Sequence, residues 1–168
     1  TAGSALILGD HAVFTLGAND LTLNNTNNDF GHVHFVSVGN AALHDINDIQ
    51  LSLAATSTVS GNLTVTTTGG NITNGAALVV GGLASFDVNG NNITLGNASN
   101  NFNNVSFNNA YNVQINDTNA LDFADTNVTN NLTVFTNGLT SDSGNISVGN
   151  MFNITTSSDP VTLDSANN

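Results

Sequence analysis

The side chains that could carry out chemistry in this chain are twelve aspartates and four histidines, because the sequence contains no Lys, Arg, Glu or Cys. An enzyme built on strands needs an activated base or an acid of raised pKa, held in a groove beside its substrate. No motif supplies such a group. We therefore expect no enzyme activity, no catalytic residue and no cofactor.

Two of the histidines have a spacing that suits a metal ligand pair. His32 and His34 flank Val33, so in a strand both imidazoles would point to the same side, about 7 Å apart. His11 and His44 stand alone in the sequence. A later copy of this segment does not reproduce the pair, which favours an ordinary polar surface, and we expect no metal site.

The densest group of oxygen ligands is Asp117, Asn119, Asp122 and Asp125. It lacks the glycine turn and the terminal Glu of an EF-hand loop, and no glycine-rich nonapeptide calcium repeat is present. We expect these side chains to be solvated turn residues. Calcium bridging is the alternative.

Eleven Asn-x-Ser/Thr sequons occur in the chain. Asn, Ser and Thr are so abundant that several would arise by chance, so glycosylation is a hypothesis that depends on the host. The sequons include those at Asn62, Asn71, Asn92, Asn131 and Asn145.

The formal net charge of −12 arises without any Lys or Arg. Phosphate binding relies mainly on these two residues, so the chain has no electrostatic footprint for DNA, RNA or anionic lipid. No apolar run approaches the ~18 residues of a membrane helix. We expect neither a nucleic-acid partner nor membrane insertion.

A tandem repeat organises the chain. Residues 1–35 align with residues 73–107 without a gap, and 15 of the 35 positions are identical. A further echo at an offset of 69 begins a third, partial copy near Gly144. The continuous repeat predicts one domain over 1–168, with repeats at about 1–72, 73–143 and 144–168. Since both ends fall inside a repeat, we expect the structure to continue, through further repeats or another copy.

Apolar residues recur in triplets of the form apolar, small polar, apolar, separated by clusters of Asn, Gly, Asp and Ser. Examples are Leu21-Thr-Leu23, Leu63-Thr-Val65 and Ile93-Thr-Leu95. This pattern predicts very short strands with one buried face, joined by tight turns. An antiparallel sandwich gives no reason for a 72-residue echo, so we predict an all-β parallel β-helix (β-solenoid) of about seven to nine coils.

Stacked coils would place asparagines over one another at the corners, where their amides can bond from coil to coil. The best candidates for such ladders are the pairs Asn28/Asn100, Asn25/Asn97 and Asn19/Asn91. We further expect the two copies to pile directly over each other, with Phe30 and Phe102 on one side.

Several motifs resemble those of large secreted bacterial proteins. These are Asn28-Asp-Phe-Gly31, Gly61-Asn-Leu-Thr-Val65 and the G-A-x-L-x-V-G pattern of Gly75 to Gly81. With the runs around them, they resemble the repeats of filamentous-haemagglutinin-like exoproteins over nearly the whole chain. The resemblance implies a right-handed parallel β-helix, located outside the cell or on its surface, in an adhesin or a fibrous matrix such as that of a biofilm.

The expected function is therefore structural: a repeat segment of a secreted or cell-surface fibrous protein, forming a stiff rod or filament by axial stacking. Its partners would be further repeats or other copies of itself stacked end to end, and a glycan or a host-surface ligand is a further candidate partner. One alternative is the spacer stalk of an adhesin whose receptor- or glycan-binding tip lies elsewhere. A second alternative is a short, self-assembling subunit resembling functional amyloid.

Overall fold

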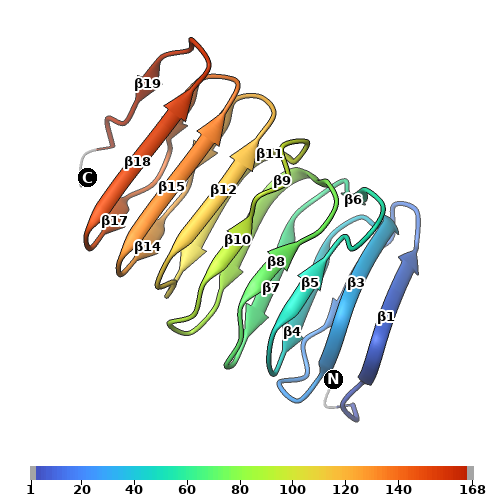
Figure 1. Cartoon of the computed structure of the whole chain (residues 1–168). Helices are drawn as coiled ribbons and strands as arrows, with labels where there is room; N and C mark the ends of the chain where they lie inside the picture. The colour runs from blue at the N-terminus through green and yellow to red at the C-terminus, as the bar shows by residue number, and fades with distance from the viewer. Residues whose placement is uncertain (1–2, 166–168) are drawn as a thin grey trace.

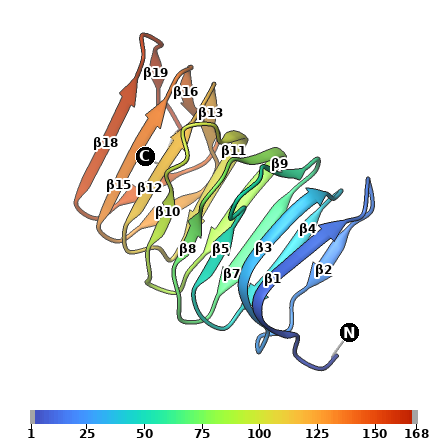
Figure 2. The ribbon, with the colours of Figure 1, turned by 45° about the vertical axis from the view of Figure 1, so that its right-hand side comes forward.

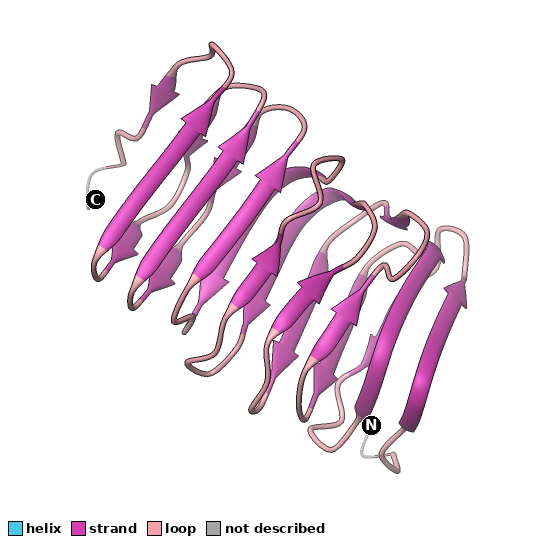
Figure 3. Cartoon of the chain, viewed as in Figure 1, coloured by secondary structure: helices cyan, strands magenta, loops and turns pink. Residues whose placement is uncertain are grey.

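The computed structural model describes residues 3–165, which form strands and turns and contain no helix. The chain coils about seven times around one axis, and each coil adds parallel strands to two facing sheets (Figures 1 and 3). In Figure 1 the front strands run upward, the rear strands run downward and the chain advances from right to left, so the coil is right-handed. The predicted all-β parallel β-solenoid is confirmed.

The front sheet of Figure 1 has eight strands, all parallel to their neighbours. In spatial order they are β1 (Ile7–Thr15), β3 (Asp29–Ser37), β5 (Ile49–Leu51), β8 (Ile72–Asn74), β10 (Ile93–Leu95), β12 (Val113–Asp117), β15 (Asn131–Thr136) and β18 (Met151–Thr156).

The back sheet holds the return strand of each coil. In spatial order these strands are β2 (Leu21–Leu23), β4 (Ala41–Asp45), β7 (Leu63–Thr67), β9 (Leu78–Asp87), β11 (Asn101–Asn108), β13 (Leu121–Phe123), β16 (Thr140–Asp142) and β19 (Val161–Thr162). Figure 2 shows both layers from a view turned by 45°.

Three short strands lie at the corners of the coils. β6 (Ser57–Val59) follows a front strand and pairs with β9, whereas β14 (Thr126–Val128) follows a back strand and pairs with β17 (Ile146–Val148). The extra strand therefore lies at the front-to-back corner in the N-terminal part of the chain and at the back-to-front corner in the C-terminal part.

The core is a set of apolar stacks between the two sheets. The front sheet stacks Ile49, Ile72, Ile93 and Val113 in register, and all four are buried. The apolar triplets of the sequence supply these inward side chains, while their central polar residues point outward. A fully buried Ile or Phe contributes about 1.5–3 kcal/mol, so coil after coil adds a similar increment of stability.

The two copies of the repeat do not pile directly over each other, and that prediction is wrong. β3 is followed in the front sheet by β5, β8 and β10, and β11 comes half a coil later in the back sheet. An offset of 72 residues thus equals three and a half coils. Phe30 at the start of β3 and Phe102 at the start of β11 are both fully buried, but in opposite sheets.

Candidate functional site

Two aspartates, Asp45 and Asp117, are buried at corners of the coils. Asp45 accepts hydrogen bonds from the backbone N–H of Phe30 (2.6 Å) and of Asn47 (2.9 Å). Three and a half coils further along the axis, in the second copy, Asp117 accepts equivalent bonds from Phe102 (2.7 Å) and Asn119 (3.1 Å). Each aspartate therefore fixes its own turn and ties it to the start of the strand one coil earlier.

Burial dominates the titration of both carboxyl groups. It raises the pKa of Asp117 from 3.8 to about 6, although the bonds from Phe102 and Asn119 act in the opposite direction. Burial also raises the pKa of Asp45. On the surface, by contrast, hydrogen bonds from the backbone and the side chain of Asn40 lower the pKa of Asp20.

A buried asparagine lies beside each buried aspartate. Asn28 accepts from the N–H of Leu6 (2.9 Å) and donates to the carbonyl of Leu23 (3.0 Å). The oxygen of Asn100 likewise accepts from the N–H of Leu78 (2.9 Å), and its amide donates to the carbonyl of Leu95 (3.0 Å). Asn28 and Asn100 occupy opposite corners, so they do not form the ladder that the sequence suggested.

The members of the other predicted ladder pairs do not bond to each other either. Asn25 and Asn97 donate to the carbonyls of Gly3 and Gly75, and Asn19 and Asn91 cap the turns that contain them. The two members of each pair lie three and a half coils apart and make the same kind of contact in different places, so these predicted ladders are wrong.

A ladder of asparagine side chains does run along the corner that precedes the front strands. Its first members are joined by bonds from the N–H of Asn71 to Asp48 (2.6 Å), from the N–H of Asn92 to Asn71 (3.0 Å) and from the amide of Asn112 to Asn92 (3.0 Å). Asn130, Asn131 and Asn150 continue it through the next coils. A shorter ladder of Asp20, Asn40 and Asn62 precedes the back strands.

The sequons at Asn62, Asn71, Asn92 and Asn131 thus fall on ladder residues. The side-chain amide of Asn71 donates to Asp48 (3.1 Å), so a glycan on that nitrogen would disturb the bond.

The histidines lie differently from the sequence expectation. His32 and His34 do share the outer face of β3, and the Nδ1 atom of His34 lies 3.1 Å from the hydroxyl of Ser57. His11, expected to be isolated, stacks on His32 with ring centroids 5.0 Å apart. His11 and His32 are 21 residues apart and are partners in the β1–β3 register. This contact could have been predicted only by knowing how many residues the first coil contains.

The oxygen-rich segment from Asp117 to Asp125 does not gather into one site. Asp117 is buried and points inward, so the expectation of a solvated turn residue is wrong for this side chain. Asp122 bonds to Asn104 and Ser141 on the outside of the back sheet. Asp125 accepts from the N–H of Asn145 at the next corner. Among the described residues, the group of three side chains that could hold a metal is instead Asp10, His11 and His32.

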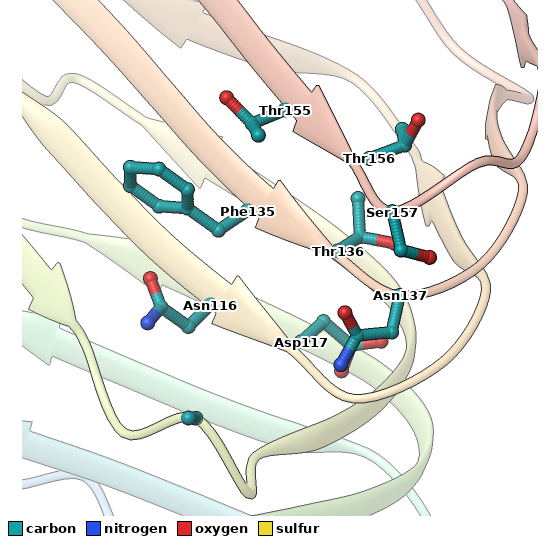
Figure 4. A pocket seen from close by; sticks show the side chains of 9 residues that line it. Asn116, Asp117, Phe135, Thr136, Asn137, Thr155, Thr156 and Ser157 are labelled. Atoms are coloured by element: carbon teal, nitrogen blue, oxygen red, sulfur yellow. The ribbon is translucent and has the colours of Figure 1, made fainter.

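A shallow hollow of about 210 Å³ lies over the ends of β12, β15 and β18. Figure 4 shows Asn116, Phe135 and Thr155 side by side on these neighbouring strands. Phe135 is 40% exposed, and the Oδ1 atom of Asn116 is buried without a hydrogen-bond partner. An exposed ring beside amide and hydroxyl groups can contact a small polar ligand, but the nearby Asp117 carboxylate is already bonded to the backbone.

The described part of the chain, residues 3–165, contains no helix with the length and apolar character that crossing a membrane requires.

Comparison with known proteins identifies a family of repeats. The family model described as repeats of unknown function, DUF5649, matches residues 1–37, 38–108 and 110–168. The middle match spans 71 residues, close to the 72-residue offset of the internal alignment. No curated protein and no solved structure matches the chain.

Proposed function

We propose that this chain, which belongs to the DUF5649 family of repeats, is a structural segment of a secreted or cell-surface fibrous protein. In this proposal its function is mechanical, as part of a stiff rod or extracellular filament.

The observation that carries this proposal is the uninterrupted bonding along one axis. Strand hydrogen bonds join every coil to the next in both sheets, and the ladder from Asp48 to Asn150 adds side-chain bonds in the same direction. Bending such a rod would stretch several parallel rows of hydrogen bonds together. This arrangement therefore favours a role as a stiff rod over a role that requires one part of the chain to move relative to another.

The composition supports an exposed setting. A chain without Lys or Arg offers trypsin-like proteases no cleavage site, and its short Asn, Thr, Ser and Gly side chains lose little rotamer entropy on ordering.

The partners in this proposal are coils of the same kind. Each coil offers the same parallel strand edges as the coil before it, so further repeats or another copy of the chain can extend both sheets.

Electron microscopy and fibre diffraction of the purified chain, and of a longer array of its repeats, test the rod. We expect particles that lengthen with the number of repeats, and a reflection near 4.8 Å along the long axis. Compact particles whose length does not grow with the number of repeats would contradict the proposal.

The location can be tested independently. Antibodies against the folded chain should label intact cells or the material that they release. Label confined to the interior of permeabilised cells would rule out an extracellular role.

The hollow at Phe135 favours one alternative, in which the segment belongs to an adhesin that contacts glycans. A glycan array separates the two functions, because a pure spacer gives no signal whereas a binding segment gives signals that Phe135→Ala abolishes. The third possibility, assembly of short amyloid-like subunits, predicts fibres that form from this chain alone and whose growth rate increases with concentration.

A further inference from the structure

We propose that Asp10, His11 and His32 form a binding site for a divalent transition-metal ion such as Zn²⁺ on the outer face of the front sheet. This inference is independent of the rod function, because it rests on side-chain geometry at the first two coils.

The three side chains converge from adjacent strands. The Nδ1 atom of His11 lies 2.6 Å from Oδ1 of Asp10, and the Nδ1 atom of His32 lies 3.9 Å from the same oxygen. One ligand atom from each residue lies within 4.8 Å of the other two. Ligands of a tetrahedral Zn²⁺ at about 2.0–2.1 Å are separated by roughly 3.3 Å, so small rotations of these side chains would complete the site.

A β-bulge places Asp10 beside the two imidazoles. In the register of β1 with β3, Leu8 pairs with Phe30 and His11 with His32, so Gly9 and Asp10 together oppose Gly31. A Cβ atom at Gly31 would lie 3.1 Å from the carbonyl oxygen of Asp10 and 3.5 Å from that of Gly9. Glycine at position 31 therefore lets the bulge approach β3 closely, and bulges commonly redirect a side chain toward a site.

One nitrogen of this cluster lacks a partner. The Nδ1 atom of His32 is buried from solvent and makes no hydrogen bond. A bound metal ion would satisfy this atom and would take over the position between the imidazoles and the carboxylate.

The donor set indicates the class of metal. Two imidazoles and one carboxylate suit Zn²⁺, Ni²⁺ or Cu²⁺, whereas Ca²⁺ and Mg²⁺ prefer oxygen ligands alone. The net charge of −12 attracts cations, and no Lys or Arg competes for Asp10. The chain supplies three ligands, and Asp10 and His11 are exposed, so water or a further ligand can complete the coordination.

The second repeat provides well-matched substitutions. Positions 72 residues after His11, His32 and His34 carry Leu83, Asn104 and Ser106, which the fold accommodates on the opposite sheet. His32→Asn should therefore remove a ligand while preserving the strand, and His34→Ser is a control on the same strand.

Isothermal titration calorimetry of the full chain, without a histidine tag and with Zn²⁺ as the titrant, tests the site. We expect one saturable site per chain, with binding weakened at least tenfold by His32→Asn or by Asp10→Asn and unchanged by His34→Ser.

Titration with Co²⁺ adds a structural readout, because its visible absorption reports the coordination geometry. Intense bands are expected from the wild-type chain and should be lost in His32→Asn. The proposal is wrong if the wild-type chain shows no saturable binding, or if folded His32→Asn, checked by circular dichroism, binds Zn²⁺ as tightly as the wild type.

Discussion

Aspartate has contrasting roles within this one chain, depending on where the coil places it. Asp45 and Asp117 are buried and tie adjacent coils together, whereas the exposed Asp20 begins a ladder of polar side chains. Burial raises the pKa of the first two, and hydrogen bonds lower the pKa of the third. With no Lys or Arg available, the carboxylates are compensated mainly by backbone N–H groups and asparagine amides.

The raised pKa of Asp117 makes stability depend on pH. Between 3.8 and about 6 the folded chain holds a proton on this group that the unfolded chain releases, so stability falls as the pH rises through this window. We expect the Tm to be higher at pH 4.5 than at pH 7, by about 5 °C for this group. Thermal unfolding followed by circular dichroism measures the difference.

In Asp117→Asn the difference in Tm between the two pH values should shrink, because the titrating group is gone while the amide oxygen still accepts from Phe102. Asp164→Asn, at an exposed position, removes the same formal charge and serves as the control. An unchanged pH profile in Asp117→Asn would contradict the assignment.

Asn112 is the most connected member of the long ladder. It donates to Asn92 and accepts from the amide of Asn130 and the backbone N–H of Asn131. Asn112→Ala should lower the free energy of unfolding by about 1–3 kcal/mol, because these groups lose their partners. Denaturant unfolding measures this loss.

Asn103→Ala, at an exposed position of β11, should change the free energy of unfolding by less than about 0.5 kcal/mol. Equal effects of the two substitutions would mean that the ladder adds nothing to stability.

Residue types alone predicted part of this chemistry. Abundant Asn at the turns indicated polar ladders, and ladders exist, but through Asn71, Asn92 and Asn112 rather than through the proposed pairs. The sequence also failed to predict the contact between His11 and His32. The partners in the ladder and in this contact depend on the number of residues in a coil, which a 72-residue echo does not reveal.

At the scale of the strand, the close approach of successive coils restricts which residues fit. A Cβ atom at Gly70 would overlap the backbone of Asn47 and Asp48 in the preceding coil, whereas one at Gly96 would make ordinary contacts with side chains of Gln114 and Thr94. Gly70→Ala must therefore displace backbone.

We expect Gly70→Ala to destabilise the chain by about 1–3 kcal/mol or more, and Gly96→Ala to leave its stability nearly unchanged. Thermal unfolding of the two variants side by side is the measurement. If both variants unfold at the wild-type temperature, the spacing between these coils is looser than the structure shows.

The strands could be predicted from the sequence because an apolar, polar, apolar triplet places both apolar side chains on one face, which is then buried. Leu63-Thr-Val65 and Ile93-Thr-Leu95 are strands with the expected buried and exposed positions. Which sheet a triplet joins was not readable. A flattened coil offers the same inner and outer surroundings on both sides, so the same sequence fits either sheet.

At the scale of the whole molecule, one coil is the smallest segment whose deletion should leave both sheets in register. Ile72 and Ile93 are register partners, so a variant lacking residues 72–92 loses one full coil and rejoins the chain in register. We expect this variant to fold, with a similar circular dichroism spectrum and a maximum dimension shorter by about 5 Å in small-angle scattering.

A smaller deletion should do more harm. Removing residues 78–87 takes away β9 alone and leaves β8 and β10 in the front sheet without a back strand between them. This variant should be far less stable than the one that lacks a whole coil. The opposite order of stabilities would refute the coil as the structural unit.

The half-turn between successive repeats determines how a longer array would present itself to its surroundings. Any epitope or ligand site that recurs once per repeat would lie alternately on the two opposite sheets of the rod. Same-side neighbours would then be two repeats apart, or seven coils, which is roughly 34 Å at 4.8 Å per coil.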